Sequence, residues 1–458
     1  MLVCSPLFLE LCTMPVSRAF RWISRLATGS LLLCCVVNPS LSQEFTQKQR
    51  EQAQAMLKDV ANDVKENYYD PHLHGIDWDA KVREAKEKID KADSFNRALS
   101  DIAAALDSLN DSHTAFMPPP RPYVHDYGFQ MQMIGDRCYV TRVRPGSDAE
   151  AKRLKPGDEI RAVNGYMPTR KDFWRMQYIF WILRPQQSLR LSILSFDGGE
   201  RQVDVIPKFR QLPKVKDLFQ MNEFDIDREM DDLEHSSRVR FFNSNYDLLI
   251  VKLPQFLDLP VGEADSIVSK MEGYKAVLFD LRGDPGGSEE MLKSLLGGVF
   301  DHKVKIGDRV GRKSTEQLNT GHHFYRFKGK LAVLVDSRSA SASEIFARVI
   351  QLEKRGVVLG DRSSGMVMGA KQYIHKTDGS ASDSFIAYGA EVTGYDLIMA
   401  DGQSLERNGV IPDILALPTA SDLSSGRDPV LSKAAELLNV TMSPEEAGKL
   451  FPFEWPKE

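Results

Sequence analysis

Residues 331–346 read LAVLVDSRSASASEIF, and this stretch joins an apolar strand, a turn of small residues and the start of a helix. The apolar run Leu331–Val335 predicts a short buried strand. A helix is expected from Ala342 to Glu353. Ser341 therefore falls at the first helical turn, where backbone N–H groups have no helical partner and can stabilise an oxyanion. Serine is also a common helix N-cap, so this position alone leaves both readings open.

A second strand ends in glycines, in the segment KAVLFDLRGDPGG at residues 275–287. Gly286 and Gly287 carry no side chain, so another backbone or a ligand can approach them closely. Their N–H groups, together with that of Ala342, are candidates for an oxyanion hole. An ordinary strand-to-helix turn is the alternative reading of these glycines.

Short apolar runs alternate with helical segments from Tyr246 onward. The runs are LLIVKLP, AVLFDLRG, LAVLVDS and GVVLGD. This alternation predicts an α/β core with a largely parallel sheet over residues 246–458. A nucleophile and oxyanion donors at the carboxyl ends of the strands fit that architecture.

The chain before the core divides into three parts. Residues 43–120 read as a helical N-terminal domain, and residues 121–208 contain strand-like runs that predict a small barrel. Residues 209–245 are charged and poorly patterned, which favours a linker or a flap. The expected N-terminal helices are Glu44–Asn67, Trp78–Ala92 and Ser94–Leu109.

The barrel carries the sequence RLKPGDEIRAVNG at Arg153–Gly165, which resembles a PDZ domain. Such domains bind the carboxylate at a peptide's C-terminus in a backbone pocket and add the peptide as a strand. The resemblance makes Tyr127, Gly128 and Phe129 the carboxylate-binding loop. The alternative is a small barrel that only spaces the other domains.

Residues 1–42 read as a secretory signal peptide. Arginines precede the apolar run LATGSLLLCCVV, which is short for a membrane span. Small residues at Ser40 and Ser42 predict cleavage after Ser42, and hence export to the periplasm or outside the cell. A retained membrane anchor is the main alternative, and translation from Met14 instead of Met1 is a second open point.

Composition narrows the classes of function. The 458 residues carry a net charge of −5, and this acidic balance does not indicate a nucleic-acid-binding protein. Four of the five cysteines lie in the leader, so the mature chain keeps only Cys138 and forms no internal disulfide. No Cys/His cluster has zinc spacing, and the sequence implies neither a metal nor an organic cofactor.

Together, DLRGDPGG and VLVDSRSASASEIFA resemble the C-terminal processing (tail-specific) and tricorn-like serine peptidases. The segments LNDSHTAF near residue 113 and LERNGVIPDI near residue 409 extend the resemblance over most of the chain after the leader. It implies a serine endopeptidase that acts on polypeptide substrates through an acyl-enzyme on Ser341. The oligomeric state is not implied.

The general base is where the sequence departs from part of this family. In the C-terminal processing peptidases the base is a lysine, but Met366 occupies the corresponding position here. Lys371 follows shortly afterwards and would need a different loop path. The tricorn-like branch uses a histidine, and Ser112-His113 and Glu406 match its pattern.

We therefore expect His113 to accept the proton of Ser341, because a histidine can exchange protons near neutral pH. Ser112 and Glu406 would orient the imidazole. Three alternatives stay open: a Ser-Lys enzyme that uses Lys371, an inactive peptide-binding protein, and a carrier of apolar ligands on the same fold.

Overall fold

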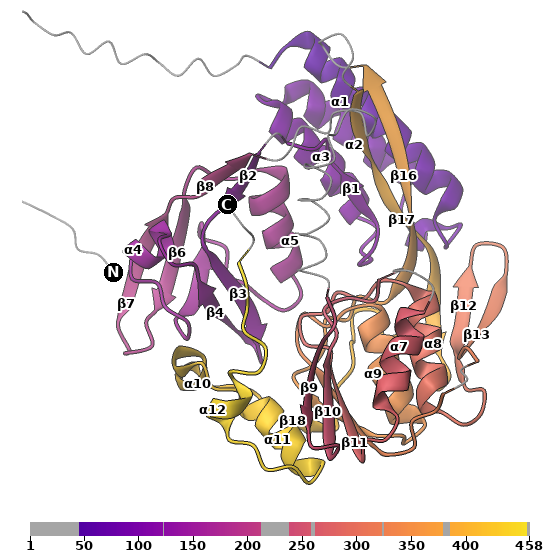
Figure 1. Cartoon of the computed structure of the whole chain (residues 1–458). Coiled ribbons are helices and arrows are strands. Elements are labelled where there is room, and N and C mark those ends of the chain that lie inside the picture. The colour runs from indigo at the N-terminus through magenta and orange to yellow at the C-terminus, as the bar shows by residue number, and fades with distance from the viewer. Residues whose placement is uncertain are drawn as a thin grey trace, which may run out of the picture. The chain divides into compact units, whose positions relative to one another are not determined.

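The computed structural model describes residues 45–121, 123–211, 238–257, 262–322, 325–378 and 385–455 (Figure 1). The chain divides into the units Met1–Glu44 and Phe45–Glu458, and all described residues belong to the second. The predicted leader with its cleavage after Ser42 lies outside them. No helix in the described ranges is long and apolar enough to cross a bilayer.

Three amphipathic helices form the N-terminal part. Each begins at a polar cap: the side chains of Thr46, Asp77 and Ser94 accept backbone N–H groups of the first helical turn. The apolar faces bury residues such as Val60 and Ile102 in one core. The predicted helices are confirmed to within a few residues, and their observed bounds are α1 Gln47–Asn67, η1 Leu73–Gly75, α2 Trp78–Lys91 and α3 Phe95–Asp107.

The predicted small barrel is present as a five-stranded antiparallel sheet in the order β3-β4-β5-β6-β7. Alternate residues of β3 and β6 are buried, as expected for strands with one face on a core. A separate pair, β2 (Tyr123–Asp126) and β8 (Lys208–Gln211), joins the two ends of this region. The other bounds are β3 Phe129–Ile134, β4 Arg137–Val143, α4 Asp148–Ala151, β5 Glu159–Val163, α5 Phe173–Gln177, η2 Tyr178–Leu183, β6 Leu189–Leu194 and β7 Glu200–Val205.

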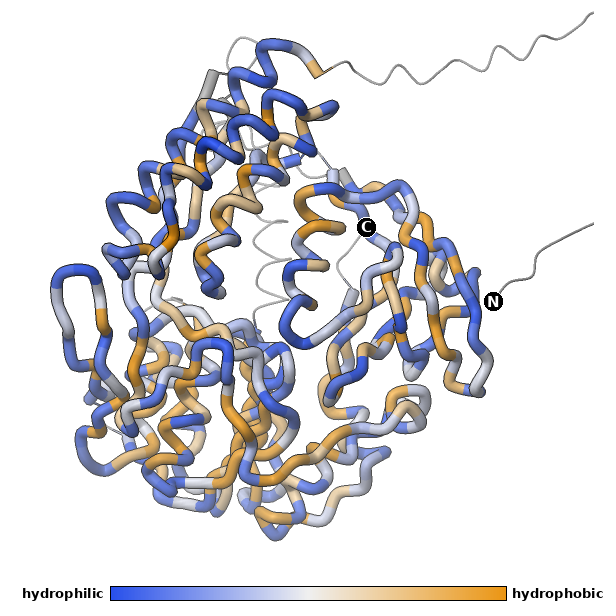
Figure 2. Tube along the Cα trace, turned by 180° about the vertical axis from the view of Figure 1, so that it is seen from behind, coloured by the Kyte–Doolittle hydropathy of each residue, from blue (hydrophilic) through white to orange (hydrophobic). Residues whose placement is uncertain are grey.

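The α/β core contains a six-stranded sheet in the order β18-β15-β14-β11-β10-β9, and only β9 is antiparallel. Residues of β11 alternate between two apolar cores, one with helices α7, α8 and α9 and one with α11 and α12, so helices cover both faces (Figures 1 and 2). The largely parallel core is confirmed. Its strands are β9 Arg240–Ser244, β10 Leu248–Lys252, β11 Ala276–Asp280, β14 Lys330–Val335, β15 Val357–Gly360 and β18 Ile414–Leu415. Its helices are α7 Glu263–Met271, α8 Glu289–Val299, α9 Ala342–Leu352, α10 Ala420–Ser425, α11 Pro429–Leu437 and α12 Pro444–Ala447.

A second sheet, absent from the sequence prediction, links the core to the N-terminal helices. Its order is β1-β17-β12-β13, and β16 pairs with β17 as a long hairpin. Side chains of β17 such as Tyr388 and Val392 pack into the core of the N-terminal helices. The bounds are β1 Ala115–Met117, β12 Lys305–Gly311, β13 Thr315–Asn319, β16 Met368–Asp378 and β17 Phe385–Met399.

Part of the predicted linker at residues 209–245 is instead sheet. Strand β9 pairs with β10 because its phenylalanines, Phe241 and Phe242, pack on the apolar cores of the main sheet. The core therefore begins before Tyr246. Residues 212–237 of that segment lie outside the described ranges.

Candidate active site

Ser341 lies at a sharp turn between β14 and α9. Its backbone adopts φ +52° and ψ −119°, a conformation that costs a non-glycine residue roughly 1–3 kcal/mol. The turn is held because the Ser341 N–H donates to Met366 O at 2.9 Å and to Glu344 Oε2 at 3.0 Å. The side chain is partly exposed, so the hydroxyl is presented at the start of a helix. Such strain is common at reactive positions.

Glu344 organises the loop that faces this serine. Its side chain is fully buried, and its carboxylate accepts the Gly365 N–H at 2.7 Å and the Met366 N–H at 3.0 Å. The Ser363 hydroxyl also donates to it. Burial raises the pKa of Glu344 to about 7, against the opposing effect of these hydrogen bonds. Glu344 therefore holds the loop at residues 363–366 against the start of α9.

Two glycines bring a second backbone segment against Ser341. A Cβ atom on Gly286 would stand 2.6 Å from the Ser341 Cβ, so only glycine fits there. The Gly286 N–H, however, donates to Asp284 Oδ1 at 2.8 Å. Within the described part of the chain, the N–H groups of Gly287 and Ala342 have no hydrogen-bond acceptor. These two N–H groups are thus the free donors of the three expected residues.

Ser112, His113 and Glu406 form one hydrogen-bonded chain. The Ser112 hydroxyl lies 2.7 Å from His113 Nδ1 and donates to Glu406 Oε2, also at 2.7 Å. Because that hydroxyl gives its proton to the carboxylate, it accepts from Nδ1–H, which assigns the imidazole proton to Nδ1. The Nε2 lone pair is then free to accept another proton. This is the tautomer that a general base requires.

Pairing between β1 and β17 brings these distant segments together. Asp111 fixes the turn before β1: its Oδ1 accepts the His113 N–H at 2.9 Å and the Thr114 N–H at 2.6 Å. The hydroxyl of Thr393, on β17, donates to the same oxygen at 2.9 Å. Sequence reasoning missed Asp111, although an aspartate two residues before a backbone donor is a usual turn signal.

The loop at residues 365–367 contacts both halves of the site. Met366 O accepts the Ser341 N–H, and the next residue, Val367, donates its N–H to Glu406 Oε2 at 3.0 Å. The histidine–glutamate chain and the serine turn are therefore separated by one peptide unit of this loop. The side chain of Lys371, by contrast, is exposed on β16 with its Nζ 5.7 Å from the Tyr373 ring centroid.

Comparison with known proteins finds family models that match three regions of the chain. Residues 247–416, which hold Ser341 and both glycines, match the model of peptidase family S41. This region of the chain is similar to the S41 peptidase domain. Residues 120–178 match the PDZ domain, and residues 49–96 match the tricorn protease C1 domain. The resemblances inferred from the sequence are confirmed at this level.

Relatives of the S41 domain are distant. The tail-specific protease of Haemophilus influenzae is 24% identical over 272 residues, covering 56% of this chain and 36% of that protein. The carboxy-terminal processing protease CtpA of Bacillus subtilis is 21% identical over 355 residues, covering 73% and 68%. The matched region spans about a third to a half of the length of the first curated relatives: it covers 36% of one of them and 51% of another.

Solved structures share the fold around the S41 domain. Mature CPAF matches with a TM-score of 0.59 at 14% identity, covering 82% of this chain and 94% of that one. The photosystem II D1 C-terminal processing protease matches with a TM-score of 0.50 at 19% identity, covering 87% and 99%. These likenesses support the architecture and carry no information on the site.

The predicted carboxylate-binding loop, Tyr127–Phe129, leads into β3, and Asp126 contacts it. The Gly128 N–H donates to Asp126 Oδ1 at 2.8 Å, so this donor is already used within the loop. Asp126 in turn pairs with Arg144 at 2.9 Å. The Tyr127 ring is buried, and its hydroxyl donates to Gln186 O at 2.6 Å. Phe129 begins β3, the edge strand of the sheet.

In the described ranges, no three His, Cys, Asp or Glu side chains gather closely enough to hold an ion. The carboxyl groups around Ser341 instead accept backbone and hydroxyl donors, as Glu344 and Asp284 do. Asp284 is also fully buried, and burial raises its pKa to about 7.

Proposed function

We propose that the chain is an exported serine endopeptidase of the tail-specific or tricorn-like type, with Ser341 as nucleophile and His113 as general base. The observation that carries the proposal is the hydrogen-bonded chain Ser112–His113–Glu406, which ends one peptide unit from the Ser341 turn. Export rests on the leader read in residues 1–42.

Each residue then has one role. The Ser341 hydroxyl attacks the peptide carbonyl while His113 Nε2 takes its proton, and the oxyanion that forms accepts the N–H groups of Gly287 and Ala342. Gly286 donates no hydrogen bond to the oxyanion; its missing side chain lets its backbone lie against Ser341. His113 next gives the proton to the leaving amine, and water hydrolyses the acyl-enzyme by the same path. Glu406, through Ser112, stabilises the charged imidazole.

Hydrolysis of an unfolded polypeptide tests this function. Incubation with the full chain should produce new termini detectable by mass spectrometry. Peptide binding without cleavage would point to the inactive binding protein instead, and co-purified lipid without peptide binding would point to the apolar carrier. Either result would remove the peptidase proposal.

The pH dependence of kcat/KM should reflect His113. Burial lowers the pKa of His113 below its usual 6.5, although Asp111 opposes the shift. A base must be neutral to act, so activity should be lost on acidification, at a step below the pH of an exposed histidine. A pH–rate profile checks this, with Lys371→Ala expected to keep the same step. A step well above neutrality would contradict the assignment.

The PDZ domain should distinguish peptides by their carboxyl terminus. If the loop at Tyr127–Phe129 captures substrate ends, peptides with a free carboxylate should bind more tightly than their amidated copies. Asp126→Asn should widen the difference, because it removes a negative charge bonded to the Gly128 N–H. Titration calorimetry measures both. Equal affinities for the two peptide forms would exclude carboxylate capture.

A further inference from the structure

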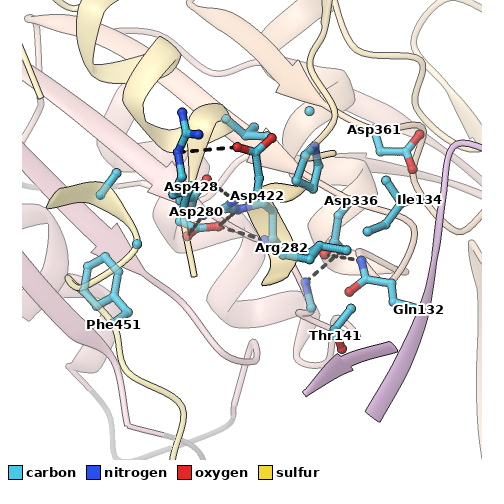
Figure 3. A pocket seen from close by; sticks show the side chains of 18 of the residues that line it. Gln132, Ile134, Thr141, Asp280, Arg282, Asp336, Asp361, Asp422, Asp428 and Phe451 are labelled. Carbon is cyan, nitrogen blue, oxygen red and sulfur yellow. Dashed lines mark hydrogen bonds and ion pairs between the residues drawn. The ribbon is translucent and has the colours of Figure 1, made fainter. Parts of the chain in front are cut away.

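A cavity of about 360 Å³ lies at the carboxyl ends of four neighbouring parallel strands (Figure 3). Strands β10, β11, β14 and β15 end there, and ligands of open α/β sheets bind at this edge. Strands β3 and β4 of the PDZ region and the segment Phe451–Phe453 complete the wall. Ser341 does not line the cavity, and its size suits a small ligand.

Most charges around the cavity are paired. Arg282 bonds Asp280 and Asp428, each at 2.8 Å at the closest, as the dashed lines in Figure 3 show. Lys252 also pairs with Asp280, at 3.2 Å. Arg282 and Lys252 are therefore neutralised by two carboxylates, Asp280 and Asp428. The remaining pairs of this kind are Arg427–Asp422 and Arg170–Asp361.

After this pairing, two guanidinium groups face one carboxylate. Arg142 and Arg338 line the cavity, and neither has a carboxylate partner in the described part of the chain. The carboxylate of Asp336 accepts neutral donors, including Gln132 Nε2 at 2.7 Å and the Gly283 N–H at 2.9 Å. Among the described residues that line the cavity, Arg142 and Arg338 are therefore the cations without an ion pair.

The guanidinium group of Arg142 is held in place but keeps free hydrogen-bond donors. Its guanidinium carbon lies 4.4 Å from the Phe453 ring centroid, and Nη1 donates to Gln130 Oε1 at 3.0 Å. The Nε and Nη2 atoms of Arg142 have no hydrogen-bond partner among the described residues. Neither atom is fully buried, so both are open to a ligand. Burial, with Arg338 and Arg282 nearby, lowers the pKa of Arg142 to about 10. An arginine stacked on one face with donors open at its edge suits a carboxylate or a phosphate, since either can accept two N–H bonds from that edge.

We propose that this cavity binds a small ligand through an oxyanion group, a carboxylate or a phosphate, held by Arg142 and Arg338. One such anion supplies a counter-charge for these two unpaired guanidinium groups and acceptors for the open donors of Arg142. The occupant would lie where the Arg282–Gly287 and Asp336–Ser341 loops leave their strands. The proposal is independent of peptidase activity.

Titration calorimetry on the full chain tests the proposal with three probes: inorganic phosphate, a capped dipeptide with a free carboxyl terminus, and its amide. Phosphate, the free dipeptide or both should bind at one site, and the amide should not. Arg142→Gln and Arg338→Gln should each weaken binding by at least about tenfold. Arg338 is exposed, so its variant keeps the test valid if Arg142→Gln fails to fold.

Arg190→Gln is the matched control, because Arg190 is an exposed arginine of the same region paired with Asp204. It should leave binding unchanged. Binding of phosphate alone would assign a free anion as the occupant, and binding of the free dipeptide alone would assign a chain end. No saturable binding of either probe, or equal binding by the wild type and both cavity variants, would overturn the proposal.

Discussion

Substitution of Ser341 by alanine is expected to abolish peptide hydrolysis, lowering kcat by at least about 10⁴-fold. The hydroxyl is the only group placed to attack the substrate in the proposed mechanism, so nothing in the site replaces it. The fold should survive, since a partly exposed serine in a turn contributes little packing. Steady-state hydrolysis and thermal unfolding measure the two effects.

Ser341→Gly provides a matched control for the strained turn. Glycine adopts φ +52° without the cost of a Cβ atom, so this variant should unfold at a temperature no lower than Ser341→Ala. Both variants should be equally inactive. Undiminished hydrolysis in either one would remove Ser341 as the nucleophile.

Loss of the His113 imidazole should have the second-largest effect. His113→Ala is expected to reduce turnover by several orders of magnitude, on the scale of losing a member of a catalytic triad. Lys371→Ala should change turnover by less than about twofold, because the Lys371 side chain is exposed beside Tyr373. Parallel measurements of kcat on the two variants make the comparison.

The reverse pattern would identify a different enzyme. An inactive Lys371→Ala beside a nearly normal His113→Ala would make the chain a Ser-Lys peptidase with a rearranged loop. Circular dichroism of both variants shows that neither result comes from unfolding, which matters because Asp111 ties the His113 backbone into the fold.

The sequence was most informative where structure is local. Apolar runs such as Leu331–Val335 identify the core strands because parallel strands covered by helices on both faces are apolar throughout. The helical spacing of apolar residues placed the N-terminal helices to within a few residues of their observed bounds. Ser341 came from its position between a strand and a helix, whereas His113 and Glu406 came from the family resemblance, since no local pattern links residues so far apart.

Long-range pairing was the part that the sequence could not predict. The register of β1 on β17 sets the meeting of Ser112 with Glu406, 294 residues apart, and depends on tertiary packing. The bond from the Gly286 N–H to Asp284, two residues earlier, is by contrast a local turn that the sequence analysis missed. That Arg142 has no ion pair became visible only after the neighbouring ion pairs were assigned.

The most direct test of the central claim is the site and rate of labelling by a serine-directed fluorophosphonate. Peptide mapping by mass spectrometry should find the adduct on Ser341 in the wild type. The rate constant should fall by several orders of magnitude in His113→Ala and stay unchanged in Lys371→Ala, because only His113 activates the hydroxyl. An adduct on another serine, or equal rates in the wild type and His113→Ala, would contradict the Ser341–His113 mechanism.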